Sequence, residues 1–147
     1  MRKILPPTYF FLYLIVGVAL HYILPVVQIF YFPWRLGGIV LLGIGLVLAV
    51  RADYLFKNKK TTVKPFQGSS ALVTEGPFRF SRHPMYLGMT FALAGVSVLL
   101  GSLSSFIAPV GFCITMQLVF IAREEKDMEN VFCKEYKEYK KNVRQWL

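Results

Sequence analysis

Three long stretches without a charged side chain limit what this chain can fold into more than any other feature. Residues 4–34, 36–50 and 83–122 contain no Asp, Glu, Lys or Arg. A helix that crosses a membrane needs about 20 mostly apolar residues, with about 17 as a lower limit. The first two stretches each provide for one span, and the third is long enough for a hairpin of two spans. They predict an integral membrane protein.

The expected fold is all-α, a single polytopic domain over residues 1–147. We expect about four transmembrane helices, at residues 8–30, 36–56, 84–100 and 106–122. Glycines recur in the second and third spans, which predicts close packing against neighbouring helices. A cleaved signal peptide at Met1-Arg2-Lys3 is disfavoured, because the apolar run behind it is too long and lacks a small-residue cleavage site.

A C-terminal amphipathic helix is expected over residues 123–144, on the cytoplasmic side. Its apolar residues recur every three or four positions between Lys and Glu: Met128, Val131, Phe132, Tyr136, Tyr139 and Val143. Such a helix is expected to lie on the membrane surface.

The basic residues are distributed asymmetrically along the chain. There are 17 Lys and Arg against 8 Asp and Glu, which gives a formal net charge of +9. With four spans, only Arg35 of these basic residues falls on the side opposite the termini. This positive-inside pattern predicts that both termini are cytoplasmic, with the cell inner membrane as the expected location. We interpret the charge as orienting the protein and contacting anionic membrane lipids, not as binding nucleic acid.

Three further residue groups within or near the spans have simple structural interpretations. His21 is a candidate functional residue inside a span, although a hydrogen bond to a neighbouring helix near the outer interface is the simpler interpretation. Pro25 is expected to kink the first span, and the aromatic residues of 31–34 are typical of an interfacial belt. Cys113 and Cys133 are not expected to form a disulfide, and two isolated cysteines predict no metal site.

Turn-forming and basic residues precede the third span, at residues 72–88. Gly76-Pro77 predicts a turn. His83 precedes Pro84, which disfavours helix at the histidine and suits a helix start at the proline. The basic and aromatic residues of this stretch therefore gather beside the free N–H groups of a helix start, where the polar part of a ligand can bind.

The last span ends at a pair of acidic residues, Glu124 and Glu125. Because the third and fourth spans form a hairpin, these carboxylates are predicted to lie close to Arg82 and His83. A ligand pocket and a purely structural salt bridge both remain open at this point.

Several blocks of residues resemble the isoprenylcysteine carboxyl methyltransferase and phospholipid methyltransferase superfamily. They are Thr61-Thr62-x-x-Pro65, Leu72-Val73-Thr74-x-Gly76-Pro77-Phe78, Arg82-His83-Pro84-x-Tyr86-x-Gly88, Glu124-Glu125-x-x-Met128, and the C-terminal Phe132, Cys133, Tyr136, Tyr139, Val143 and Arg144. Together the blocks run in the family's order over more than half the chain.

The resemblance implies S-adenosylmethionine as the methyl donor, bound without a Rossmann fold by the last two spans and the C-terminal helix. The residues that it implies for the cofactor pocket are Leu72, Val73, Phe78, His83, Pro84, Tyr86, Glu124, Glu125 and Tyr136. Arg82 is expected either to pair with the carboxylate of the cofactor or to bridge to Glu125. The chain lacks an alternating strand–helix pattern and a glycine-rich nucleotide turn, which agrees with this implication.

The chain departs from the family pattern at two positions. Cys133 stands where a glycine is usual, and we expect an effect on local packing only. Phe120 stands where the prenylcysteine enzymes carry an arginine for the substrate carboxylate, at a place where an apolar residue can face lipid or substrate. Arg123, about one helical turn further on, is the candidate substitute for that arginine, and we list it with Arg82 as a catalytic candidate.

The expected function is methyl transfer from S-adenosylmethionine to a lipophilic or small apolar acceptor at the cytoplasmic membrane interface. The alternative is a non-catalytic membrane scaffold or transport subunit that retains the family fold. The acceptor atom and the oligomeric state stay open.

Overall fold

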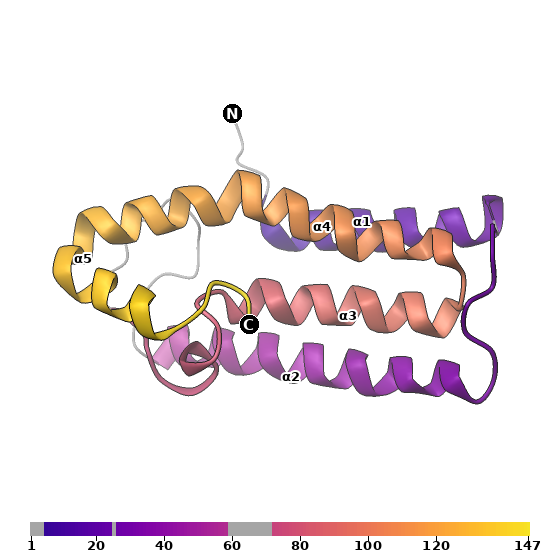
Figure 1. Cartoon of the computed structure of the whole chain (residues 1–147), viewed down its shortest axis with the longest axis horizontal. Helices are drawn as coiled ribbons and strands as arrows, with labels where there is room; N and C mark the ends of the chain where they lie inside the picture. The colour runs from indigo at the N-terminus through magenta and orange to yellow at the C-terminus, as the bar shows by residue number, and fades with distance from the viewer. Residues whose placement is uncertain (1–4, 25, 59–71) are drawn as a thin grey trace.

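The computed structural model describes residues 5–24, 26–58 and 72–147. Four helical segments run side by side in a bundle: α1 (Pro6–Ile23), α2 (Gly37–Asn58), α3 (Pro84–Leu100) and α4 (Ile107–Thr115) (Figure 1). Among the described residues, three helical stretches are long and apolar enough to cross a membrane, Pro6–Ile23, Trp34–Asn58 and Leu103–Asn142, and α3 is a shorter apolar helix. Within the described ranges there is no strand, only an isolated bridge between Gln28 and Ser102. The all-α polytopic fold is confirmed.

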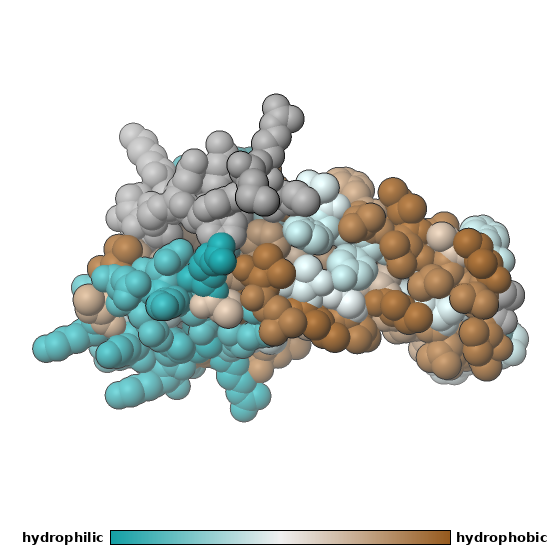
Figure 2. All heavy atoms as spheres, turned by 90° about the horizontal axis from the view of Figure 1, so that it is seen from above, coloured by the Kyte–Doolittle hydropathy of each residue, from teal (hydrophilic) through white to brown (hydrophobic). Residues whose placement is uncertain are grey.

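Polar and apolar surfaces are separated along the length of the bundle. Hydrophilic side chains gather over one end, and hydrophobic side chains cover much of the rest (Figure 2). The start of α1, the end of α2 and the start of α3 all lie at this polar end (Figure 1). The arrangement agrees with the expected asymmetry of charge, while the side that faces the cytoplasm stays a prediction. Residues 1–4, Pro25 and the Thr61–Pro65 block lie outside the described residues.

The first helix is shorter than expected. It ends at Ile23, whereas the sequence predicted a span to residue 30. Leu24 precedes a proline, which disfavours helical backbone in the residue before it. Beyond it the chain pairs with the α3–α4 turn instead: the Ile29 N–H donates to the Gly101 carbonyl at 2.8 Å and the Leu103 N–H donates to the Val27 carbonyl at 2.9 Å. These backbone bonds replace the helical ones that residues 26–30 were expected to make.

At the end of the bundle that carries the α3–α4 turn, polar side chains form hydrogen bonds within the protein. His21 Nδ1 lies 2.9 Å from the Ser102 hydroxyl, which confirms the simpler interpretation of this histidine. Arg35 donates to the Phe30 carbonyl at 2.8 Å and to the Gln28 side chain. The aromatic residues Tyr31, Phe32 and Trp34 are exposed, as an interfacial belt requires.

Helices α2 and α3 approach so closely that their backbones touch. A Cβ atom added at Gly45 would lie 2.4 Å from the Gly88 carbonyl oxygen, and one added at Gly88 would lie 2.6 Å from the Gly45 oxygen. No side chain fits at such separations, so glycine is required on both helices. The predicted close packing is confirmed.

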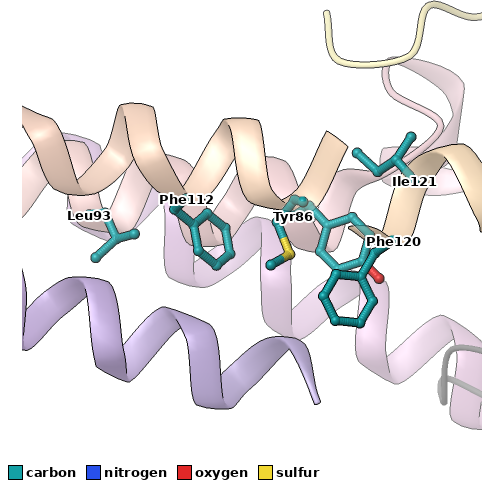
Figure 3. Packing of buried hydrophobic residues seen from close by; sticks show 6 residues of the cluster. Tyr86, Leu93, Phe112, Phe120 and Ile121 are labelled. Atoms are coloured by element: carbon teal, nitrogen blue, oxygen red, sulfur yellow. The ribbon is translucent and has the colours of Figure 1, made fainter. Parts of the chain in front are cut away.

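The main core lies where α3 and α4 meet α1. Its buried residues are Tyr86, Leu93, Phe112, Met116, Phe120 and Ile121 (Figure 3). Aromatic residues of α1 pack against this core, and the Tyr9 ring meets the Phe120 ring edge to face at 5.7 Å. The core therefore extends to the polar end, where Tyr86 forms part of it.

The fourth span and the C-terminal helix form one helical run. After α4 comes a π-helical segment, η4 (Met116–Ile121), which leads directly into α5 (Ala122–Asn142). At Cys133 the backbone leaves the helical region, with φ 41° and ψ −104°, and α5 turns back toward the start of α3 (Figure 1). The helix expected over 123–144 is therefore present as α5, with a kink at Cys133 that the sequence did not predict. Tyr136 and Tyr139, beyond the kink, are buried against the protein.

Candidate active site

The site begins with the turn that leads into α3. A short helical turn, η2 (Gly76–Arg79), starts at Gly76, whose φ of 59° suits glycine. His83 is the residue before α3 and has non-helical backbone angles, as its position before Pro84 predicts. Its backbone N–H donates to the Ser81 hydroxyl at 3.2 Å. This bond helps to fix His83 at the polar end of the bundle, directly before α3.

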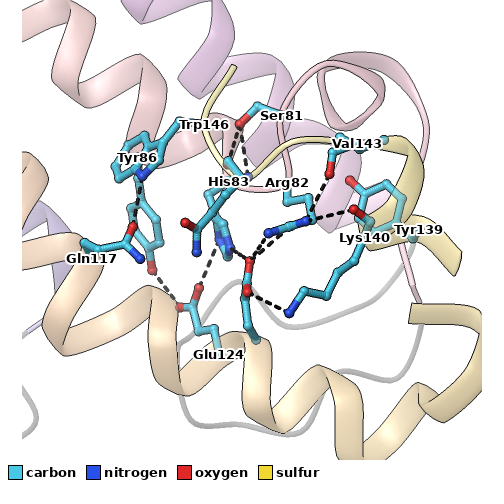
Figure 4. Close-up of polar contacts among 12 residues, drawn as sticks. Ser81, Arg82, His83, Tyr86, Gln117, Glu124, Tyr139, Lys140, Val143 and Trp146 are labelled. Carbon is cyan, nitrogen blue, oxygen red and sulfur yellow. Dashed lines mark hydrogen bonds and ion pairs between the residues drawn. The ribbon is translucent and has the colours of Figure 1, made fainter. Parts of the chain in front are cut away.

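The structure brings the start of α3 against the start of α5 (Figure 4). The Tyr86 hydroxyl donates to Glu124 Oε1 at 2.6 Å. The His83 ring lies between the two carboxylates, with Nδ1 3.6 Å from Glu124 and Nε2 3.4 Å from Glu125. The two sequence-distant clusters thus meet as the hairpin arrangement predicted.

Arg82 connects this cluster to the end of the chain. It donates to Glu125 Oε1 from Nη2 at 2.7 Å and from Nε at 3.0 Å, and from Nη1 to the Val143 carbonyl at 3.0 Å. Its backbone N–H donates to the Arg144 carbonyl at 3.0 Å, and the Ser81 hydroxyl donates to the Gln145 carbonyl at 3.2 Å. We call the group Ser81, Arg82, Glu125 and Lys140 the tail clamp, because it holds residues 143–145.

Glu125 is fully engaged in the tail clamp. Lys140 Nζ lies 3.2 Å from its second carboxylate oxygen. Burial alone would raise the pKa of the Glu125 carboxyl, but the hydrogen bond from His83, the charge of Arg82 and the bonds from Lys140 and Arg82 outweigh it and lower this pKa to about 2. Of the two roles expected for Arg82, the structure shows the bridge to Glu125. Any contact of Arg82 with a ligand stays a prediction.

Glu124 has the opposite electrostatic environment. Burial raises the pKa of its carboxyl above the ordinary value, with a further increase from the nearby Asp127, while the Tyr86 bond and His83 only partly oppose this effect. Its side chain is still 23% exposed. A carboxylate that is largely desolvated yet open on one side is suited to accept hydrogen bonds from a ligand. We call Tyr86, His83 and Glu124 the Glu124 site.

The remaining predicted cofactor residues divide into two groups. Pro84 is buried at the start of α3, and Tyr136 is buried beside Tyr139 with its ring centroid 6.0 Å from Lys140 Nζ. Val73 and Phe78 instead form a small core with Ala52 of α2, and Leu72, next to Val73, is half-buried. The Tyr139 hydroxyl links the groups by donating to the Phe78 carbonyl at 2.6 Å.

Phe120 and Arg123, the two positions considered for binding a substrate carboxylate, differ in burial. Phe120 is 1% exposed and packs between the rings of Tyr9 and Tyr86, so of the two environments expected at this position, lipid or substrate, lipid is excluded. The π-helical geometry of residues 116–121 accompanies this inward orientation. Arg123 lies in the exposed first turn of α5, beside Glu124. Its role as a substrate-binding residue stays a prediction.

Sequence reasoning missed several residues at this end of the molecule. Ser81 and Lys140 carry no sequence signal, because their roles depend on the path of the folded tail. Gln117 did carry one, since it is a polar side chain within an otherwise apolar span. It accepts a hydrogen bond from the indole of Trp146 at 2.9 Å.

Comparison with known proteins assigns this arrangement to a family. Over 63 residues, the chain is 35% identical to an uncharacterized protein of Haemophilus influenzae, which corresponds to 43% of this chain and all of that protein. A family model described as phospholipid methyltransferase matches residues 33–135, which include Arg82, His83, Tyr86, Glu124 and Glu125. This match covers more than half of the chain and includes both the α3 start and the acidic pair. The chain therefore belongs to the phospholipid methyltransferase family of integral membrane methyltransferases.

Proposed function

We propose that the protein transfers a methyl group from S-adenosylmethionine to a lipophilic or small apolar acceptor at the cytoplasmic membrane interface. The family supports methyl transfer as the reaction class. The observation that carries the assignment to this site is the contrast between adjacent carboxylates. Glu125 is engaged by Arg82 and Lys140, whereas Glu124 is desolvated, partly exposed and bonded by Tyr86.

The side chains present fit such a donor. Glu124 can accept hydrogen bonds from ribose hydroxyls or from the methionyl ammonium group. The rings of His83 and Tyr86 are nearly parallel, at 17° with centroids 5.9 Å apart, and offer flat aromatic surface for adenine or for a cationic sulfonium. When bound, S-adenosylmethionine supplies an electrophilic methyl group: the acceptor's lone pair forms the new bond to carbon, the carbon–sulfur pair stays on sulfur, and S-adenosylhomocysteine leaves.

The protein's own contribution is orientation and exclusion of water. Methyl transfer needs in-line approach, so a fixed geometry lowers the barrier more than acid–base chemistry does. The tail clamp fixes α5 against α3 and thereby places Glu124 beside Tyr86 and His83. Arg82 acts in this proposal as a positioning residue, and a proton lost by an amine or thiol acceptor passes to water.

The packed core around Phe120 limits which acceptors we expect the protein to use. A prenylated cysteine would bring its carboxylate toward a buried aromatic cluster without the arginine usual at that position. We therefore expect prenylcysteine analogues to be poor acceptors compared with a neutral or cationic lipid or a small apolar thiol. Efficient methylation of farnesylcysteine would contradict this expectation and favour Arg123 as the partner of the carboxylate. We expect Phe120→Arg to carry a folding cost, because the charge would enter this core.

Equilibrium binding of S-adenosylhomocysteine to detergent-purified protein tests the function. We expect saturable binding by the parent protein, because Glu124, Tyr86 and His83 already lie together in the folded chain. A protein that is folded but does not bind the product would be the alternative, a membrane scaffold or transport subunit that retains the family fold.

A further inference from the structure

The last residues of the chain return from the polar end toward the membrane-spanning part of the bundle. Helix α5 ends at Asn142, and Val143 has extended backbone angles, φ −126° and ψ 130°. The tail clamp then donates to the next three backbone carbonyls in order: Arg82 donates to those of Val143 and Arg144, and Ser81 donates to that of Gln145. These consecutive bonds fix the backbone of residues 143–145 and thereby the position of Trp146, which follows them.

Trp146 reaches the inner surface of the fourth span. Its indole N–H donates to Gln117 Oε1 at 2.9 Å, and its ring packs against the core that contains Tyr86 and Phe120. Figure 4 shows the Trp146 indole and Gln117 on the same side of the cluster as Tyr86. The tail thus brings Trp146 beside Tyr86, a residue of the Glu124 site.

Gln117 lies deeper in the membrane-spanning part than Glu124 does. It precedes Glu124 by about two helical turns, and its neighbours Leu118 and Val119 are exposed apolar residues, at 72% and 43%. Polar side chains at such depth are costly unless they are paired. The Trp146–Gln117 contact therefore lies between the Glu124 site and the apolar part of the bundle, where a lipophilic acceptor would approach.

We propose that Trp146, held by Gln117, closes the bilayer-facing route to Tyr86 and Glu124 and limits the size of the acceptor's apolar chain. This inference rests on the proposed methyl transfer and deepens it by naming a residue for acceptor specificity. A slim chain passes beside the indole, whereas a long or bulky one requires the indole to leave Gln117. The competing role for Trp146 is that of a membrane anchor, with its ring in lipid.

An acceptor-independent measurement separates the two roles. Trp34→Phe leaves Trp146 as the single tryptophan, and Trp146→Phe leaves Trp34, which is 76% exposed at the other end of the bundle. In bilayers of phosphatidylcholine with dibrominated acyl chains, we expect Trp146 to be quenched much less than Trp34. Gln117→Leu in the Trp34→Phe background should raise the quenching of Trp146. Equal quenching of the two tryptophans, with no effect of Gln117→Leu, would identify a membrane anchor and overturn the proposal.

Acceptor size provides the second test. Methyl transfer to butanethiol, octanethiol and dodecanethiol is compared for the parent, for Trp146→Ala and for the control Trp34→Ala. We expect Trp146→Ala to raise the kcat/KM ratio of dodecanethiol to butanethiol by about tenfold or more, the scale on which an apolar pocket discriminates chain size. The control should keep the parent's ratio.

S-adenosylhomocysteine binding keeps the two proposals distinguishable. A parent that fails to bind it disproves the methyl-transfer function itself. Normal binding with the same chain-length profile in parent and Trp146→Ala disproves only the role of Trp146. If neither protein transfers to any thiol, the quenching measurement alone decides between the two roles of Trp146. A large loss of S-adenosylhomocysteine affinity in Trp146→Ala would place the indole in the donor site and also overturn the proposal.

Discussion

The tail clamp and the Glu124 site lie side by side and are built from the same two chain segments, yet their polar groups are satisfied to different degrees. In the clamp, Arg82 and Glu125 side chains are only 9% and 12% exposed and each is bonded on several sides. In the Glu124 site, the carboxylate is bonded by Tyr86, lies 3.6 Å from His83 and remains 23% exposed. The difference shows that the clamp is bonded within the protein, and it supports our proposal that Glu124 serves a ligand.

The far end of the bundle supports this distinction. There, His21 is bonded to Ser102, and Arg35 is bonded to the Phe30 carbonyl and to Gln28. An intramembrane histidine with its partner in place needs no ligand to explain it, because the cost of burying a polar group is offset by the hydrogen bond. Being buried and ionisable is therefore a weaker sign of function than being buried and incompletely bonded.

The largest expected effect comes from breaking the tail clamp. Arg82→Ala leaves the Glu125 carboxylate buried without its main partner and frees the tail carbonyls, and the loss of one partner of a buried ion pair costs about 3–5 kcal/mol. We expect the free energy of unfolding in mixed detergent micelles to fall on that scale. Arg79→Ala, at an exposed position of η2, is the matched control. Equal stabilities of the two variants would show that the clamp does not support the fold.

The Glu124 site should respond mainly in ligand affinity, and its loss should not unfold the protein. Glu124→Gln keeps the size of the side chain but removes a charged acceptor, and hydrogen bonds to charged groups contribute about 1.5–3 kcal/mol. S-adenosylhomocysteine affinity should then fall roughly 10- to 150-fold, while the protein stays folded. Glu125→Gln should instead lower stability. Unchanged affinity in Glu124→Gln would exclude Glu124 from the donor site.

Glu124 and Glu125 should also contribute to the free energy of unfolding with opposite pH dependences. The folded-state pKa of Glu125 is lowered from 4.5 to about 2, so its contribution is present above pH 4.5 and is lost as the pH falls toward 2. The folded-state pKa of Glu124 is raised, so its contribution is present below pH 4.5 and is lost as the pH rises through the raised value.

Unfolding of parent, Glu124→Gln and Glu125→Gln as a function of pH measures this contrast. The stability advantage of the parent over Glu125→Gln should shrink in acid. Relative to the parent, Glu124→Gln should gain stability as the pH rises above 4.5. Parallel curves for both variants would mean that the two carboxyls share one environment.

The smallest effect is expected at the kink that lets α5 return to the clamp. Cys133 adopts φ 41°, a conformation that costs a residue with a Cβ atom on the order of 1–3 kcal/mol. Cys133→Gly should raise the free energy of unfolding by about 1 kcal/mol, because the greater freedom of glycine in the unfolded chain offsets part of the relief. Cys133→Ala keeps the Cβ atom and should show no such gain. If Cys133→Gly is less stable than Cys133→Ala, the backbone at Cys133 is not strained.

Much of the bundle was determined by the sequence alone. Uncharged stretches predicted the membrane class, the span expected at residues 84–100 matches α3, and the glycines of α2 and α3 predicted their close contact. The meeting of Arg82 and His83 with the acidic pair followed from hairpin topology. These features are local or nearly so: hydropathy, turn chemistry and side-chain size act on a chain segment whatever surrounds it.

Only the tertiary structure decided how the polar groups are shared. Nothing in the sequence separates Glu124 from Glu125, because the difference comes from the bonds that Arg82 and Lys140 make to Glu125, and Lys140 lies beyond the kink at Cys133. The same applies to Cys133, where the expectation of a packing effect missed a backbone requirement, and to residues 26–30, which exchange helical bonds for pairing with the α3–α4 turn. Hydrogen-bond partners distant in sequence are chosen by the fold, and so the fold decides which of the two carboxylates is bonded on several sides and which is not.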